Sequence, residues 1–235
     1  MKKRTIHALL VSTGLVLLIG ANQQITAAKL GLFQNHKDIG ITPKKGSAKY
    51  DSKKEEYNVT GGGANIWAKT DAFQMVYQRI SGDVTLTADV HFVGEGVEHH
   101  RKAALMIRQS LEPDAPYADV ALHGDGLTSL QYRTTAGEVT KEERSELKGP
   151  VRLRIKRHGN EFTMEAGNPG EELKSTGPVT VELKDPVYIG LAVCSHNAHV
   201  LETAGFSKVE LQRDAQQTQN RFQLLAHDSW RGGLR

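Results

Sequence analysis

The chain has 235 residues, a formal net charge of +3 and one cysteine, Cys194. A single cysteine excludes an intramolecular disulfide, so the fold must be held by its core, which a chain of this length can supply. Because Lys2, Lys3 and Arg4 contribute to the charge, the rest of the chain is close to neutral. With no basic block and no helix to carry one, we predict no binding to nucleic acid.

The first 28 residues have the layout of a secretory signal peptide. A basic start precedes an uncharged, mostly apolar run over residues 8–20, and the small residues Thr26 and Ala28 suit cleavage before Lys29. The alternative is an uncleaved membrane anchor, although a spanning helix needs about 20 apolar residues. We therefore expect an exported protein, periplasmic or extracellular, with no membrane span after cleavage.

Short runs of alternating apolar and polar residues follow a polar lead-in over residues 29–37. Residues 84–93 are typical of a half-buried strand, because apolar side chains occupy every second position. The expected strands are residues 47–51, 56–60, 72–80, 84–93, 103–111, 117–123, 128–134, 151–157, 161–166, 179–183, 187–194 and 204–211. Such spacing predicts an all-β fold, a two-sheet antiparallel sandwich or a barrel, over residues 38–213.

Two segments lack this alternation. Residues 137–147 are rich in charge and could hold a helical turn, and a charged loop explains them as well. Residues 214–235 are glutamine-rich and show neither a strand nor a helix period, so we expect a flexible carboxy-terminal tail.

Four expected strands, residues 103–111, 117–123, 128–134 and 151–157, each have one apolar and one polar face. If they are neighbours in one sheet, their polar side chains form a patch on the face that the partner sheet leaves uncovered. That patch is rich in planar groups, which suit the contacts that sugars receive, whereas an ordinary solvated face is the alternative. The candidate ligand-binding residues are Arg108, Asp119, His123, Gln131, Arg133 and Arg154, with Trp67 as a stacking aromatic or else a core residue.

Several segments resemble a family of small bacterial exported domains in the concanavalin A-like lectin/glucanase superfamily. They are GGGANIWAKTDAFQMVYQRISGDVTLTADV, AALMIRQSL, PYADVALHGDGLTSLQYR, VRLRIKRHGNEFTMEAG and VYIGLAVCSHN. The family is usually labelled as of unknown function or "regulation of enolase"-like, and its Ile-Arg-x-Ser element falls on Ile107, Arg108 and Ser110. The resemblance implies a two-sheet jelly roll whose concave sheet can carry a saccharide site, in domains often attached to propellers or enzymes of bacterial envelopes.

Catalysis would require paired acids. A retaining glycoside hydrolase needs two carboxylates about 5 to 5.5 Å apart, which enzymes of this superfamily set along one strand as E-x-D-x-x-E or E-x-D-x-E. The nearest approach is Glu161 and Glu165, with Thr163 where the aspartate belongs. Asp119, one acid among arginines, is expected to have a depressed pKa as an ion-pair partner. These observations favour a non-catalytic protein.

We predict neither a metal site nor a cofactor. Glu98, His99 and His100 lie in a loop that gives no fixed ligand geometry. The Asp and Asn residues that calcium would require are dispersed. The sequence therefore indicates an exported, non-catalytic binding module with a carbohydrate on the concave sheet face. One alternative is a module that docks on another protein of the cell envelope, and a glycoside hydrolase-like enzyme is the third reading.

Overall fold

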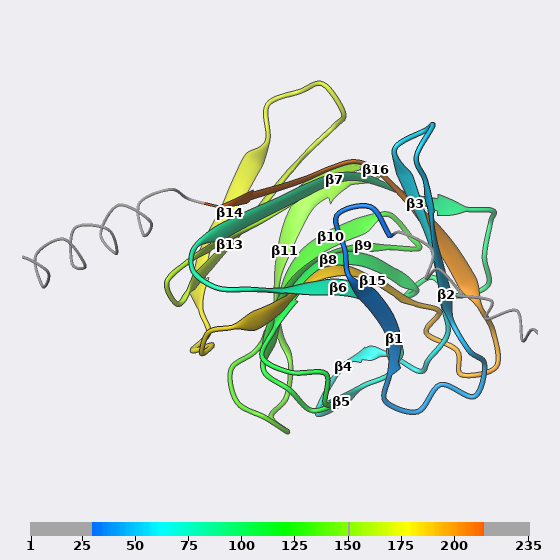
Figure 1. The fold of residues 1–235 in the computed structure, drawn as a ribbon, viewed down its shortest axis with the longest axis horizontal. Coiled ribbons are helices and arrows are strands. Elements are labelled where there is room, and N and C mark those ends of the chain that lie inside the picture. Colours follow the sequence, from blue (N-terminus) through cyan, green and yellow to red (C-terminus); the bar gives the residue numbers. More distant parts are fainter. Residues whose placement is uncertain (1–29, 150, 214–235) are drawn as a thin grey trace, which may run out of the picture.

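A computed structural model of the chain describes residues 30–149 and 151–213, which form two seven-stranded antiparallel sheets and one small hairpin (Figure 1). The predicted two-sheet antiparallel sandwich is therefore confirmed. The predicted signal peptide, residues 1–28, and the predicted tail, residues 214–235, lie outside the described residues. Over the part of the chain that the structure covers, no helix has the length and apolar character needed to cross a membrane.

The first sheet, called the pocket sheet below, has the strand order β1-β6-β15-β8-β9-β10-β11. Its strands are β1 (Asn35–Ile39), β6 (Phe73–Ile80), β15 (Val187–Cys194), β8 (Lys102–Arg108), β9 (Tyr117–His123), β10 (Leu127–Arg133) and β11 (Lys141–Lys148).

The second sheet, called the back sheet, has the order β14-β13-β12-β7-β16-β3-β2. Its strands are β14 (Lys174–Thr180), β13 (Glu161–Gly167), β12 (Val151–His158), β7 (Val84–Val93), β16 (Glu202–Arg213), β3 (Glu56–Gly61) and β2 (Ser47–Asp51). The hairpin consists of β4 (Ile66–Trp67) and β5 (Thr70–Asp71).

The main core lies between the two sheets. Because successive side chains of a strand point to opposite faces, the alternation in the sequence sends every second residue inward. Leu105 of β8 and Val120 of β9 thereby belong to one buried cluster with Leu86 of β7 and Leu153 of β12. Each such side chain contributes about 1.5 to 3 kcal/mol through burial. The apolar faces predicted from the sequence are the ones that the structure buries.

Two corrections to the expected strands bear on the site. Residues 151–157 are not neighbours of the other three polar-faced strands, because β12 pairs with β7 and β13 in the back sheet. Residues 137–147 are not a loop or a helical turn, because most of them form β11, which pairs with β10 at the edge of the pocket sheet. An edge strand with both faces largely in solvent carries no apolar alternation, so its pattern is not that of a half-buried strand.

The hairpin β4–β5 covers part of the pocket face, which is the face of the pocket sheet that points away from the back sheet. Ile66 of β4 is fully buried in a second apolar cluster with Met75, Ala104 and Met106 from that face. Figure 1 shows β4 and β5 lying on the side of the pocket sheet opposite to β7 and β16. The pocket face is therefore partly a second core and only partly open to solvent.

Candidate functional site

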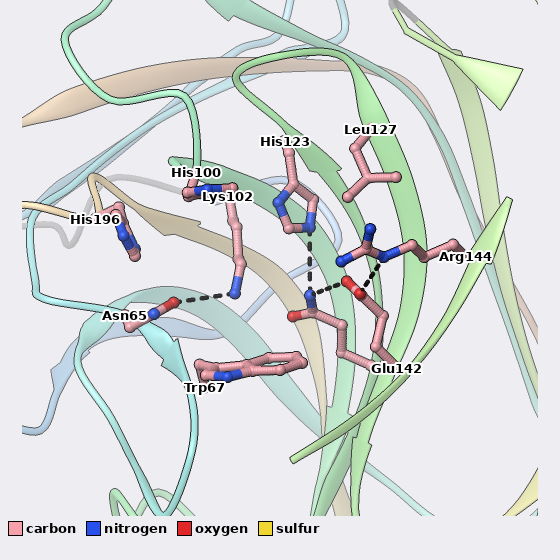
Figure 2. A pocket seen from close by; sticks show the side chains of 10 residues that line it. Asn65, Trp67, His100, Lys102, His123, Leu127, Glu142, Arg144 and His196 are labelled. Carbon is pink, nitrogen blue, oxygen red and sulfur yellow. Dashed lines mark hydrogen bonds and ion pairs between the residues drawn. The ribbon is translucent and has the colours of Figure 1, made fainter. Parts of the chain in front are cut away.

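An open pocket with a cavity volume of about 230 Å³ lies on the pocket face beside the hairpin (Figure 2). Three residues predicted from the sequence line it, namely Trp67, His123 and Gln131. They come from β4, β9 and β10, so one wall is the hairpin and the floor is the sheet. The remaining lining side chains include Asn65, His100, Lys102, Glu142, Arg144 and His196.

Gln131 is at the centre of the polar floor. It stands opposite Glu142 of β11 on one side and Asp119 of β9 on the other. Its amide nitrogen donates a hydrogen bond to Glu142 Oε1 at 3.0 Å and lies 3.3 Å from His123 Nε2. The amide carbonyl of this buried side chain has no hydrogen-bond partner among the described residues.

His123 is held as a neutral imidazole. Gln131 Nε2 and Ser129 Oγ both lie 3.3 Å from His123 Nε2, and as donors they make Nε2 an acceptor and leave the ring proton on Nδ1. Burial, with a further contribution from Lys102, lowers the pKa of His123 to about 4. At neutral pH the site therefore presents a buried Nδ1–H donor, which has no partner in the described part of the chain.

Glu142 and Arg144 form the wall that β11 supplies. Arg144 Nε donates to Glu142 Oε2 at 2.6 Å, and Figure 2 shows both side chains reaching into the pocket. Burial alone would raise the pKa of Glu142, but hydrogen bonds from Arg144 and Gln131 outweigh it and lower that pKa. Glu142 is thus a carboxylate with its charge already matched.

Trp67 supplies the one aromatic surface among the lining residues of this pocket. Its side chain is half-buried, and the Lys102 ammonium lies 5.2 Å from the ring centroid. Lys102 Nζ donates to Asn65 Oδ1 at 3.0 Å and to the Ile66 carbonyl at 2.7 Å. Figure 2 shows the indole ring below Lys102 and Asn65. Trp67 is therefore a pocket residue and not part of the sandwich core.

Arg108 and Arg133 do not reach the pocket, which corrects the expectation that they contact a ligand. Both are fully buried under the hairpin and share the carboxylate of Asp71. Arg133 donates to both Asp71 oxygens, at 2.8 and 2.7 Å, whereas Arg108 donates to the carbonyls of Ser110 and Glu112 at 2.6 Å each. The two arginines stabilise the attachment of the hairpin to the sheet.

Arg154 also lies outside the site. It belongs to β12 in the back sheet, where it donates to Thr87 Oγ1 at 3.0 Å and to Glu165 Oε2 at 2.8 Å. The sequence assigned it correctly to a polar face but to the wrong sheet. Glu161 and Glu165, considered above as an incomplete catalytic pair, lie on neighbouring β13 of the same sheet.

Asp119 is on the pocket face but is fully buried, and neither of its oxygens has a hydrogen-bond partner among the described residues. Burial raises the pKa of Asp119 to about 8. The expectation of a depressed pKa is therefore wrong, because the arginines on this face are matched by Asp71 and not by Asp119.

Sequence reasoning missed most of the charged pocket residues. Lys102 has the same parity as Arg108, so extending the expected strand by one residue at its start would have found it. Glu142 and Arg144 gave no such signal, because the edge strand β11 lacks alternation. No group of three or more His, Cys, Asp or Glu residues in the described ranges is arranged to hold a metal ion.

Comparison with protein-family models found no match, and comparison with curated protein sequences found none either. Solved structures do resemble the fold. A functionally unknown protein from Saccharomyces cerevisiae has a TM-score of 0.57 at 12% identity, over 76% of this chain and 96% of that one. A GH43 protein from Bacillus licheniformis has a TM-score of 0.50 at 10% identity, over 77% of this chain and 39% of that one.

The carbohydrate binding module CBM66 from Bacillus subtilis has a TM-score of 0.49 at 12% identity, over 77% of this chain and 97% of that one. Identities this low carry information about the fold alone. The likeness to the first two structures therefore supports the two-sheet sandwich seen in this chain. The chain therefore has an all-β, two-sheet jelly-roll sandwich fold.

Proposed function

We propose that this protein is an exported, non-catalytic module that binds a carbohydrate in the pocket beside the hairpin. The observation that carries the proposal is the half-buried indole of Trp67, which lies across the pocket from the polar floor of His123 and Gln131. An aromatic face opposite hydrogen-bonding groups matches the two kinds of surface that a sugar ring presents.

The chemistry of each wall supports this proposal. A sugar ring has an apolar C–H face, which loses contact with water when it stacks on the indole. Its hydroxyl groups both donate and accept, so they can satisfy the Nδ1–H of His123 and the carbonyl of Gln131. Those two buried atoms lack partners among the described residues. Buried polar groups in native proteins nearly always have partners, so a ligand is a reasonable source of them.

The size of the pocket favours a small group. Its volume of about 230 Å³ lies below the roughly 300 to 1,000 Å³ of pockets that enclose drug-sized ligands. One sugar ring fits such a volume better than several. The ligand would therefore be recognised through a single residue of the glycan.

The acids of the pocket support binding without catalysis. Among the described residues that line it, Glu142 is the one carboxylate, and Arg144 holds it in an ion pair. Retaining hydrolysis of a glycosidic bond needs a second carboxylate about 5 to 5.5 Å away, one of the two with a raised pKa to act as the acid. A lowered pKa makes Glu142 a poor proton donor.

Export is part of the same proposal and is supported by the sequence of residues 1–28. The resemblance to bacterial exported domains points in the same direction. Amino-terminal sequencing of the protein recovered from an expressing bacterium is expected to begin at Lys29. Recovery of the intact amino terminus with the membrane fraction would show an anchor in its place.

Binding can be tested on a glycan array and then by calorimetric titration of the sugars that give a signal. Trp67→Ala should weaken binding about tenfold or more, because it removes the stacking surface. Tyr188→Ala is the matched control, since Tyr188 is an aromatic residue on β15 of the pocket sheet that does not line the pocket. Denaturation curves of both variants separate lost binding from lost folding.

The other readings of the sequence predict different outcomes. Release of reducing sugar from a polysaccharide, abolished in Glu142→Gln, would make the protein a glycoside hydrolase. Absence of any glycan signal, together with capture of one envelope protein by wild type and Trp67→Ala alike, would favour protein docking. Equal glycan binding by Trp67→Ala and wild type would remove the pocket from the proposal.

A further inference from the structure

Lys102 is the least expected residue of the pocket. It begins β8, where it stands opposite His123 of β9 and Cys194 of β15. The residue as a whole is 3% exposed, yet its side chain lines the pocket. A lysine that buried is uncommon unless a carboxylate pairs with it.

The hydrogen bonds of Lys102 leave its charge unmatched. Both of its acceptors, the amide oxygen of Asn65 and the carbonyl of Ile66, are neutral. An ammonium group has three donors, so one remains for another acceptor. No ion pair within 4.0 Å in the described residues includes Lys102. The preceding residue is different, because buried Arg101 has Glu202 Oε2 at 2.8 Å.

The neighbouring acids do not supply the missing charge. Asp119, the acid with the largest influence on Lys102, has no hydrogen bond and no ion pair to Lys102 among the described residues, and burial raises the pKa of its carboxyl. Glu142 pairs with Arg144, and Asp71 pairs with Arg133 and Arg108. Burial lowers the pKa of Lys102, and an anion beside the ammonium group would raise it again.

The other groups around the pocket are basic or neutral. His123 is uncharged, and burial and Lys102 together lower the pKa of His196. The His100 ring lies 5.4 Å from that of His196, centroid to centroid, at the rim. The pocket therefore presents one uncompensated positive charge, set beside an aromatic ring and neutral hydrogen-bonding groups.

We infer that the saccharide carries a carboxylate, as a uronic acid does, and that this carboxylate is the counter-ion of Lys102. The inference rests on the proposed function and specifies its ligand class. A monoanionic carboxylate matches one ammonium group, whereas a phosphate group, with up to two negative charges, would suit several cations or a bidentate arginine. The Lys102 ammonium lies 5.2 Å from the centroid of the Trp67 ring, so a carboxylate on Lys102 would bring the ring of the same sugar beside the indole.

The test compares ligands that differ only in charge. Two series of sugars are titrated into the wild-type protein by calorimetry. One series is galacturonate, its methyl ester and galactose, and the other is glucuronate, its methyl ester and glucose. We expect one of the uronates to bind about tenfold or more tightly than its own ester and its neutral sugar, because a hydrogen bond to a charged group is lost in both. The preference should shrink at high salt as the charges are screened.

A variant adds a second measurement. Lys102→Gln should lose the preference for the uronate over its ester, while Lys49→Gln, which changes an exposed lysine on β2, should keep that preference. If the Lys102 variant does not fold, the ester comparison on wild-type protein still decides. Equal affinity for uronate, ester and neutral sugar overturns the inference and leaves saccharide binding intact.

Two further outcomes are distinct. Tighter binding of a sulfated sugar than of either uronate would overturn the carboxylate assignment. If none of these sugars binds, and a glycan array gives no signal with wild type, the proposed function fails and the inference fails with it.

Discussion

The two ends of the pocket face differ in how their buried positive charges are paired. Under the hairpin, Arg133 and Arg108 share the Asp71 carboxylate and fill their remaining donors with backbone carbonyls. At the open end, Lys102 is equally buried but has neutral acceptors only. The closed end has its carboxylate within the fold, whereas no described residue supplies a counter-ion at the open end. Under the proposed function, a buried cation on this sheet face is a structural anchor where the fold neutralises it and a binding group where a ligand does.

The largest expected effect is at the closed end. Asp71→Asn leaves two fully buried guanidinium groups without their carboxylate, and should lower the free energy of unfolding by about 3 to 5 kcal/mol. Urea denaturation measures this. Glu210→Gln is the control, because Glu210 pairs with Arg152 on the surface and should cost no more than about 1 kcal/mol. Equal losses in the two variants would show that Asp71 does not hold the arginines.

Asp119 separates the two ends and is expected to make stability depend on pH. Its folded-state pKa of about 8 lies above the ordinary 3.8, so between these values the unfolded state releases a proton that the folded state keeps. The contribution of protonated Asp119 to the free energy of unfolding is therefore fully present below about pH 4 and is lost as the pH rises towards 8. Asp119→Asn should remove this loss and be more stable than wild type at pH 8 by a few kcal/mol.

Denaturation of wild type and Asp119→Asn at several pH values checks this expectation, with exposed Asp125→Asn as the control. A wild-type protein that is the more stable at pH 8 would mean that ionised Asp119 pairs with Lys102. The charge of Lys102 would then be matched within the fold, and the contrast between the two ends of the face would disappear.

The smallest effect is expected on the back sheet. Arg154→Ala removes a partly exposed residue that pairs with Glu165 and lies on the sheet opposite the pocket. It should cost about 1 kcal/mol of stability or less and leave saccharide affinity unchanged within about twofold. A loss of affinity comparable to that of Trp67→Ala would show that the ligand reaches the back sheet.

The sequence predicts the layers of this fold well, because alternation alone determines which side chains of β8, β9 and β10 enter the core. It also identifies three pocket residues, Trp67, His123 and Gln131. The sequence does not reveal that the hairpin β4–β5 covers Arg108 and Arg133. Asp71 is far from both arginines in sequence, and no local pattern indicates that they pair.

Two further errors have a common cause in strand order. The alternation along a strand shows which face a side chain occupies but not which sheet the strand joins. It therefore groups Arg154 with strands that belong to the other sheet. The charged strand β11 has no apolar face, so no alternation predicts it. Its residues Glu142 and Arg144 are therefore absent from the predicted site. Both errors depend on long-range pairing, which local patterns do not contain.

The hairpin β4–β5 has a consequence for how a polymer could be recognised. By closing one end of the pocket face with Ile66 and the arginine anchor, it blocks the path that a long glycan would take across all the strands. Under the proposed function, a polysaccharide would then reach the pocket by a terminus or a side branch. The number of protein molecules bound would follow the count of chain ends, so enzymatic shortening of a polymer would create binding places for this protein instead of destroying them.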